Sequence, residues 1–222
     1  TVSPKQDKGI VGKLLTYLGG IFVFSGICLL IGFIWDDIGS AQRIIVTFGT
    51  GQAAFILGFA AARDERFEKA ATPLFLASSF LQPFGLFVFL AEYIPQPGDP
   101  ELAGMLIFGM LAIQQALAFW SLKRTSLLFF AMIFWNGFIG TAMDLLHWDG
   151  EPIGLILGVS MLSFAYAASK TAHRAIVPFW FFIGGATVLT SWWALVEGGP
   201  LDISYLGLNA FLIYFSIRTA SR

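Results

Sequence analysis

Eight apolar segments alternate with short polar connections along the chain, and each segment is apolar all round rather than along one stripe. Most of them reach the roughly 20 residues with which a helix crosses the hydrocarbon core of a bilayer. A membrane-spanning β-strand needs only about 10 residues and alternates apolar with polar positions, so the segment lengths exclude strands. The pattern predicts an all-α fold, a polytopic bundle of eight transmembrane helices. The predicted spans are residues 14–35, 44–62, 70–94, 102–122, 126–146, 153–169, 175–196 and 201–217, and residues 1–222 form a single integral membrane domain.

The connections between these segments alternate in charge. Twelve of the 13 basic residues lie at the N-terminus or in every second connection, and Arg43 is the exception. Ten of the 14 acidic residues lie in the remaining connections. Because cytoplasmic loops carry an excess of Lys and Arg, the alternation predicts that every segment spans the membrane and that both chain ends are cytoplasmic. The composition, 57% hydrophobic and 12% charged, excludes an ordinary soluble domain, of which about 25% is charged.

Residues that carry catalysis, metals or cofactors are scarce. Cys28 is the single cysteine, so an intrachain disulfide is excluded. His147 and His173 fall on opposite sides of the predicted membrane and cannot hold one haem together. Four polar residues gather near one outer turn: Asp144, His147, Asp149 and Glu151. Solvation at the interface and a divalent cation both explain that cluster. With no phosphate loop and no nucleophile motif, we expect no enzymatic activity, no metal and no cofactor, and no nucleic-acid partner.

Tryptophans concentrate near the two predicted membrane interfaces. At the acidic side these are Trp35, Trp148, Trp192 and Trp193, and toward the basic side Trp120 and Trp180. Tryptophan prefers the headgroup region because its ring is apolar and its N–H needs a partner, so the pattern predicts two aromatic belts. The 24 phenylalanines are interpreted as lipid-facing bulk and packing between helices.

Carboxamides, rather than charges, occupy the centres of the spans. No Asp, Glu, Lys, Arg or His lies near the middle of any predicted span, which argues against a proton-driven pump with a carboxylate carrier. Six amides lie there at similar depth: Gln52, Gln82, Gln114, Gln115, Asn136 and Asn209. A buried amide that faces lipid without a partner costs on the order of a few kcal/mol. We therefore expect most of them to point into the bundle.

Two interpretations of the amides stay open. In one, they form an interhelical hydrogen-bonded layer that specifies packing. In the other, they line a polar cavity that binds a small uncharged ligand. Gln82 precedes Pro83, which frees a backbone carbonyl one turn back and predicts a bend at this point of the third span.

Arg43 is the basic residue that departs from the charge alternation. It follows the acidic turn of the first hairpin, and we expect it to lie at the outer interface and pair with Asp36 or Asp37. Its expected role is to fix the geometry of that hairpin.

The opening stretch carries a resemblance, on about 30 residues: Leu18-Gly19-Gly20, Gly26, Gly32-Phe33-Ile34-Trp35-Asp36-Asp37-Ile38 and Arg43. This pattern resembles the first hairpin of a family of polytopic bacterial inner-membrane proteins of unknown function, with its Leu-Gly start and Trp-Asp turn. The third span, with Gln82 midway and Tyr93 at its end, is loosely similar to a later region of the family. The resemblance implies a bacterial inner-membrane protein with eight or more spans, and it brings no catalytic residue.

These observations predict a non-enzymatic integral membrane protein. The leading hypothesis is a scaffolding or accessory subunit that contacts the lipid bilayer and packs against other membrane subunits or against itself. The alternative is a facilitator or exporter that passes a small neutral or amphipathic molecule through an amide-lined cavity in mid-membrane.

Overall fold

The computed structural model describes residues 22, 26, 29, 32–94, 99–197, 199 and 201–220, with side chains up to residue 217 in the last helix. The first predicted span, residues 14–35, lies mostly outside the described residues. The helices in chain order are α2 (Ser40–Ile44), the π-helical segment η1 (Ile45–Gly49), α3 (Thr50–Ala61), α4 (Glu68–Tyr93), α5 (Pro100–Leu122), α6 (Thr125–Leu145), α7 (Gly150–Ser169), the 3-10 turn η2 (Arg174–Ile176), α8 (Val177–Val196) and α9 (Ser204–Ala220).

Six described helices are long and apolar enough to cross a membrane: Ser40–Ala61, Glu68–Tyr93, Pro100–Leu122, Thr125–Leu145, Gly150–Ser169 and Arg174–Val196. They confirm the predicted class, an all-helical, multi-pass membrane protein. The sixth predicted span is longer than expected, because α7 begins at Gly150 and has 20 residues. Pro152 is tolerated there because the N–H groups of the first helical turn have no partner within the helix. Helix α9, with 17 residues, is shorter than these six, so the eighth predicted span stays a prediction.

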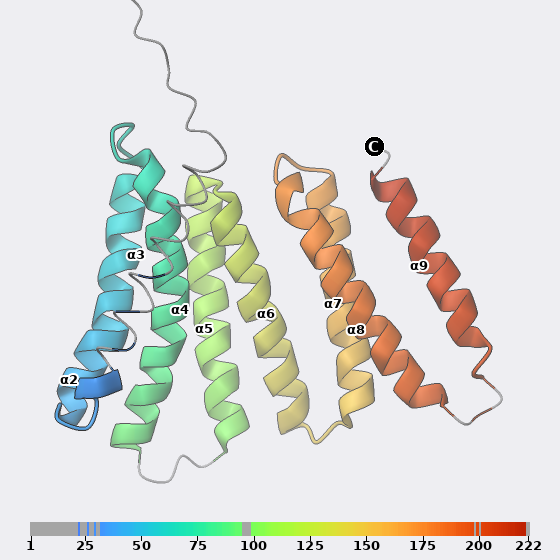
Figure 1. The fold of residues 1–222 in the computed structure, drawn as a ribbon, viewed down its shortest axis with the longest axis horizontal. Coiled ribbons are helices and arrows are strands. Elements are labelled where there is room, and N and C mark those ends of the chain that lie inside the picture. The colour runs from blue at the N-terminus through green and yellow to red at the C-terminus, as the bar shows by residue number, and fades with distance from the viewer. Residues whose placement is uncertain are drawn as a thin grey trace, which may run out of the picture.

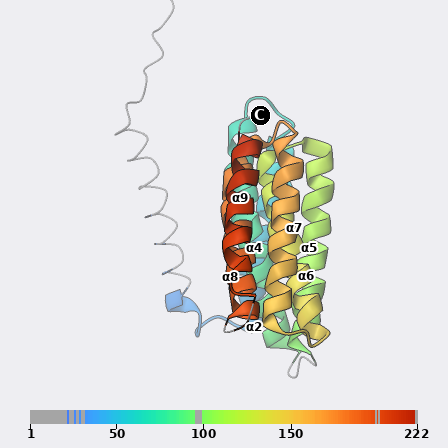
Figure 2. The same cartoon turned by 90° about the vertical axis from the view of Figure 1, so that its right-hand side faces the viewer.

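The helices stand side by side in a row that is broad in one view and shallow in the other (Figures 1 and 2). Contacts are densest within three antiparallel pairs, α3 with α4, α5 with α6 and α7 with α8. Each pair is closed by one of the turns 62–67, 123–124 and 170–173. All three turns lie at one end of the row, the end that also holds the C-terminus, and we call it the basic end. Neighbouring pairs are joined at the opposite, acidic end.

Glycines set the closest approach within two of the pairs. A Cβ on Gly85 of α4 would lie 2.5 Å from the Cα of Phe48 in η1, so the two backbones touch directly. In the α7–α8 pair a Cβ on Gly158 would lie 2.9 Å from the backbone N of Val188, and one on Gly184 would lie 3.1 Å from the carbonyl of Gly158. Small residues let membrane helices approach this closely, and dispersion contacts then hold the pair.

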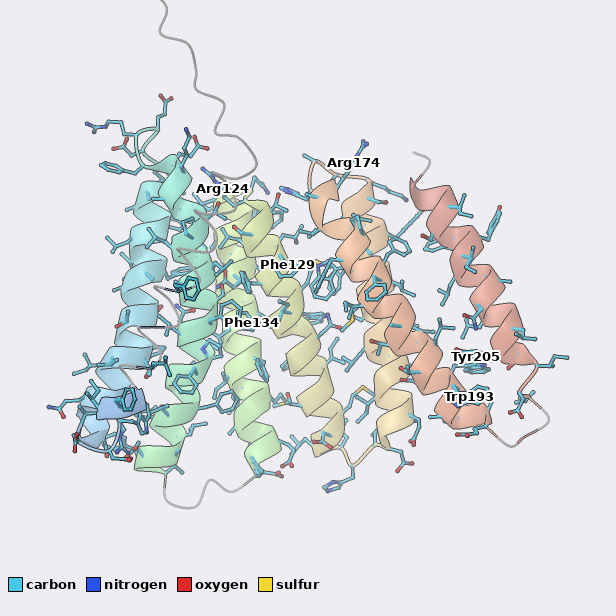
Figure 3. The ribbon with its side chains drawn as sticks, viewed as in Figure 1. Arg124, Phe129, Phe134, Arg174, Trp193 and Tyr205 are labelled. Carbon is cyan, nitrogen blue, oxygen red and sulfur yellow. The ribbon has the colours of Figure 1, made fainter. Side chains whose placement is uncertain are left out.

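An aromatic core lies along α6 and links the pairs. Phe134 stacks on Phe108 of α5, with ring centroids 6.4 Å apart, whereas Phe129 lies toward the α7–α8 pair, 5.5 Å from the ring of Trp180 (Figure 3). Trp180 is only 2% exposed, so the prediction that it belongs to an interfacial belt is wrong. It packs with Met132 and Ala165 instead, because α8 turns this face toward α6 and α7. Trp120 is 73% exposed.

The two ends of the bundle differ in the residues that lie there. Arg124 and Arg174 are at the basic end, and the aromatic residues Trp193 and Tyr205 are at the acidic end (Figure 3). Arg124 ties the α5–α6 turn to α4 through Glu68, with 2.7 Å between Nη2 and the carboxylate. Within the α3–α4 turn, hydrogen bonds from the Arg66 side chain and backbone N–H lower the pKa of Asp64.

Candidate functional site: an amide network between α3, α4 and α5

The buried face of α4 is polar at mid-helix. Ser78, Ser79 and Gln82 lie on this face, and at most 2% of each residue is exposed. Their spacing of three to four residues places them on one side of the helix, above the buried Phe75. Helix α4 continues through Pro83 to Tyr93 without interruption. This helix therefore presents a polar stripe to its neighbours in the middle of the bundle.

Gln82 joins three helices through hydrogen bonds between amides. Its Nε2 donates to the Oε1 of Gln52 on α3, and its Oε1 accepts from the Nε2 of Gln114 on α5 over 3.4 Å. Helix α3 comes close to α4 at this point, because a Cβ on Gly51 would lie only 2.9 Å from the backbone N of Gln82. These three amides therefore bond directly to one another, and we call them the amide network.

A second polar contact lies beside the network. Gln115 of α5 is fully buried and donates from Nε2 to the hydroxyl of Ser79 over 3.2 Å. That hydroxyl in turn donates to the carbonyl of Phe75 over 2.8 Å. Three buried oxygens in this part of the bundle have no hydrogen-bond partner among the described residues: Ser78 Oγ, Gln115 Oε1 and Asn136 Oδ1.

The two remaining amides do not join the network. Asn136 of α6 is 6% exposed, and its Nδ2 donates to the carbonyl of Met132 one turn back in the same helix, over 2.8 Å. Asn209 of α9 does the same with the carbonyl of Tyr205, over 2.9 Å. The six amides have similar predicted depths in the membrane, but the structure does not bring all of them together.

Arg43 has a different partner from the one expected. Its guanidinium pairs with Glu92 near the end of α4, 2.5 Å from Oε1, and not with Asp36 or Asp37. Ser40 donates to the other carboxylate oxygen of Glu92 over 2.5 Å. Arg43 also donates to the carbonyl of Trp35 over 3.0 Å, so it does hold the first outer turn, through the backbone.

The π-helical segment η1 explains this change of partner. In an α-helix, the residue four positions before Phe48 would lie on the face toward α4, and that residue is Ile44. A π-helical turn contains about one residue more, so Arg43, five positions before Phe48, occupies this place instead. Thr47, 2% exposed, donates its hydroxyl to the carbonyl of Arg43 over 2.7 Å, which provides this carbonyl with a partner inside the altered turn. Sequence reasoning missed Glu92 because it paired Arg43 only with local acids; the opposite charge of Glu92 at the matching end of α4 was the available signal.

The chemistry of the network is limited to hydrogen bonding. Amides are neutral at all physiological pH values, and each offers one acceptor oxygen and two donor hydrogens. Such groups hold helices together or recognise an uncharged polar molecule, but they do not transfer protons on their own. No known family, curated protein or solved structure matches this chain.

Proposed function

We propose that this chain is a non-enzymatic structural subunit of a bacterial inner membrane, with eight spans and both ends in the cytoplasm, that packs against other membrane proteins. The alternating charge of the connections supports the topology, since the described turns alternate between the two ends of the bundle. The resemblance of the opening hairpin supports the bacterial inner membrane.

The direct bonding of Gln52, Gln82 and Gln114 carries this proposal. Amides that bond to one another specify which helices meet, and they leave few donors or acceptors for a solute. Four cavities among the described residues are lined by other side chains, and of the six mid-span amides only Asn209 borders one of these four.

The shape of the bundle supports a role in assembly. The described helices form a single row, which buries less of each helix than a round bundle does and gives this part of the chain two broad faces (Figure 2). Large apolar side chains are exposed on many helices, among them Leu106, Ile113 and Leu117 of α5. Such faces contact either lipid or the helices of another subunit.

Purification in mild detergent tests this proposal. A structural subunit is expected to co-purify with other membrane proteins in fixed stoichiometry, and a solitary, monodisperse chain would contradict it. Reporter fusions after Arg66 and Lys123 should read cytoplasmic, and fusions after Asp99 and Gly150 periplasmic. The opposite pattern, or two basic turns on different sides, would contradict the topology.

A facilitator is the second candidate, and the unpartnered oxygens of Ser78, Gln115 and Asn136 favour it. Buried polar atoms without a protein partner are rare in folded proteins and often bind water. For a facilitator, Gln82→Leu should abolish the flux of water or glycerol into proteoliposomes, measured by stopped-flow light scattering, while the protein stays folded. A structural subunit should show no flux above that of empty vesicles, in either form.

A further inference from the structure

A groove separates α8 from α9 over much of their length. One cavity of about 520 Å³ opens at the basic end, and a second of about 360 Å³ continues toward the middle of the bundle. Both are lined by Phe181, Phe182, Gly185, Leu212 and Ser216, so they form one continuous space. We call it the α8–α9 groove.

Aromatic rings and one hydrogen bond hold α9 beside α8. At the acidic end, Trp192 donates to the hydroxyl of Ser204 over 3.0 Å, and the ring of Trp193 lies 5.2 Å from that of Tyr205. Toward the basic end, the ring of Phe215 lies 5.6 Å from the ring of Phe181. The ring of Phe181 also lines the groove, so bulky side chains keep the backbones of the two helices apart.

Two adjacent glycines show where close packing stops. Gly184 faces α7, where an added Cβ would lie 2.9 Å from the Cβ of Met161. Gly185 lines the groove, and an added Cβ there would have no heavy atom within 4 Å. Small residues thus bring α8 onto α7, while the neighbouring side of α8 stays open.

The mouth of the groove at the basic end is positively charged. Arg174 lines it and forms no ion pair with any residue that the structure describes. The adjoining α7–α8 turn, residues 169–176, contains Lys170 and Arg174 and no acidic residue. By contrast, Arg66 and Arg124 in the other basic turns are neutralised by Asp64 and Glu68.

We propose that the α8–α9 groove binds an anionic phospholipid, with one acyl chain between Phe182 and Leu212 and the phosphate at Arg174. Basic pockets between helices on the cytoplasmic side recognise anionic headgroups through charge. The volume excludes a partner's spanning helix, which occupies roughly 2,000 Å³ or more at a diameter of about 10 Å and a length of about 30 Å. It fits the range of roughly 300–1,000 Å³ in which proteins bind small ligands. This inference rests on the proposed cytoplasmic location of the basic end, and it does not depend on packing against other subunits.

Native mass spectrometry of the full chain in detergent tests the proposal, with phosphatidylglycerol and phosphatidylcholine of identical acyl chains as probes. We expect one phosphatidylglycerol to bind about fivefold more tightly than phosphatidylcholine, and Arg174→Gln to remove that preference. Gly185→Leu, which fills the groove, should weaken both lipids. The matched controls are Arg66→Gln, at the same end but already paired, and Gly207→Leu, on α9 where an added Cβ meets nothing within 4 Å.

Several outcomes would overturn the proposal. Equal affinity for the two lipids, or an unchanged preference in Arg174→Gln, would show that charge does not determine binding. Equal effects of Gly185→Leu and Gly207→Leu on lipid affinity would show that the groove is not the binding site. A dimer that forms with loss of the bound lipid would instead make the groove an interface between two copies. Thermal unfolding of each lipid-free variant establishes that it is folded, and the Arg174 comparison stands even where Gly185→Leu does not fold.

Discussion

The contact of α4 with the continuous α2–η1–α3 helix and the contact of α9 with α8 differ in what holds each together. The first combines backbone contact at Gly85, the amide bonds of Gln82 and the ion pair of Glu92 along one face of α4. The second has ring contacts, such as Trp193 with Tyr205, and one hydrogen bond at the acidic end, from Trp192 to Ser204, and it leaves a groove between the helices. Within lipid, apolar surface alone gives helices little reason to associate. Close backbone approach and polar bonds therefore decide which helices form a fixed unit. Between α8 and α9 such contacts are few, and this leaves space for another molecule.

The same substitution at a glycine in each region should give the largest difference. We expect Gly85→Ala to destabilise the protein by about 3 kcal/mol, because the new methyl group would meet the backbone of Phe48, which cannot rotate away. Gly185→Ala should leave stability unchanged, since its methyl group enters open space. Unfolding in a titration with a denaturing detergent measures both. Equal stability of the two variants would show that the α3–α4 contact is looser than described.

Removal of an amide should also destabilise the protein more in the first region than in the second, with a smaller difference than the glycine substitutions give. Gln82→Leu is expected to lower the free energy of unfolding by about 1–2 kcal/mol, because it breaks two interhelical hydrogen bonds and leaves the amides of Gln52 and Gln114 without their partner. Asn209→Leu should change stability by less than about 0.5 kcal/mol, since Asn209 bonds only within its own helix. The same denaturation experiment compares them. In the double variant Gln52→Leu/Gln82→Leu part of the loss should be recovered, and strict additivity of the two single effects would argue against direct coupling.

The ion pair at the acidic end should contribute less than the amide network. We expect Arg43→Gln and Glu92→Gln to lower the thermal midpoint by similar small amounts, because each removes one side of the same pair. Asp36→Asn serves as the control and should have no effect, since Asp36 does not pair with Arg43. A larger effect for Asp36→Asn than for Glu92→Gln would restore the local pairing expected from the sequence.

The smallest expected effect is a pH dependence confined to the α3–α4 turn. The pKa of Asp64 is lowered by its hydrogen bonds from Arg66, so the ionised carboxylate favours the folded state. The contribution is present above the unfolded pKa of about 3.9 and is lost as the pH falls through the lower, folded value. In the Asp64→Asn variant the thermal midpoint should therefore change less between about pH 4 and pH 2 than it does in the parent protein. An identical pH profile for the two would show that this turn contributes nothing.

The sequence by itself determined the class of the protein and which turns share one end of the bundle. Segment length and charge alternation are properties of neighbouring residues, because the bilayer imposes the same thickness and the same charge asymmetry on every span. The helical membrane architecture follows from them, and so does the placement of basic turns at one end. The inward position of Gln82 also follows, since lipid offers an amide no partner.

Only the tertiary structure decided which residues meet. Gln52, Gln82 and Gln114 came together while Asn136 and Asn209 did not, because the rotation of each helix about its axis depends on glycine contacts far away in the sequence. Arg43 reached Glu92 through the extra residue of a π turn, which an α-helical periodicity does not anticipate. The α8–α9 groove follows from side-chain contacts between two helices, and hydropathy contains no signal for the space that those contacts leave between them.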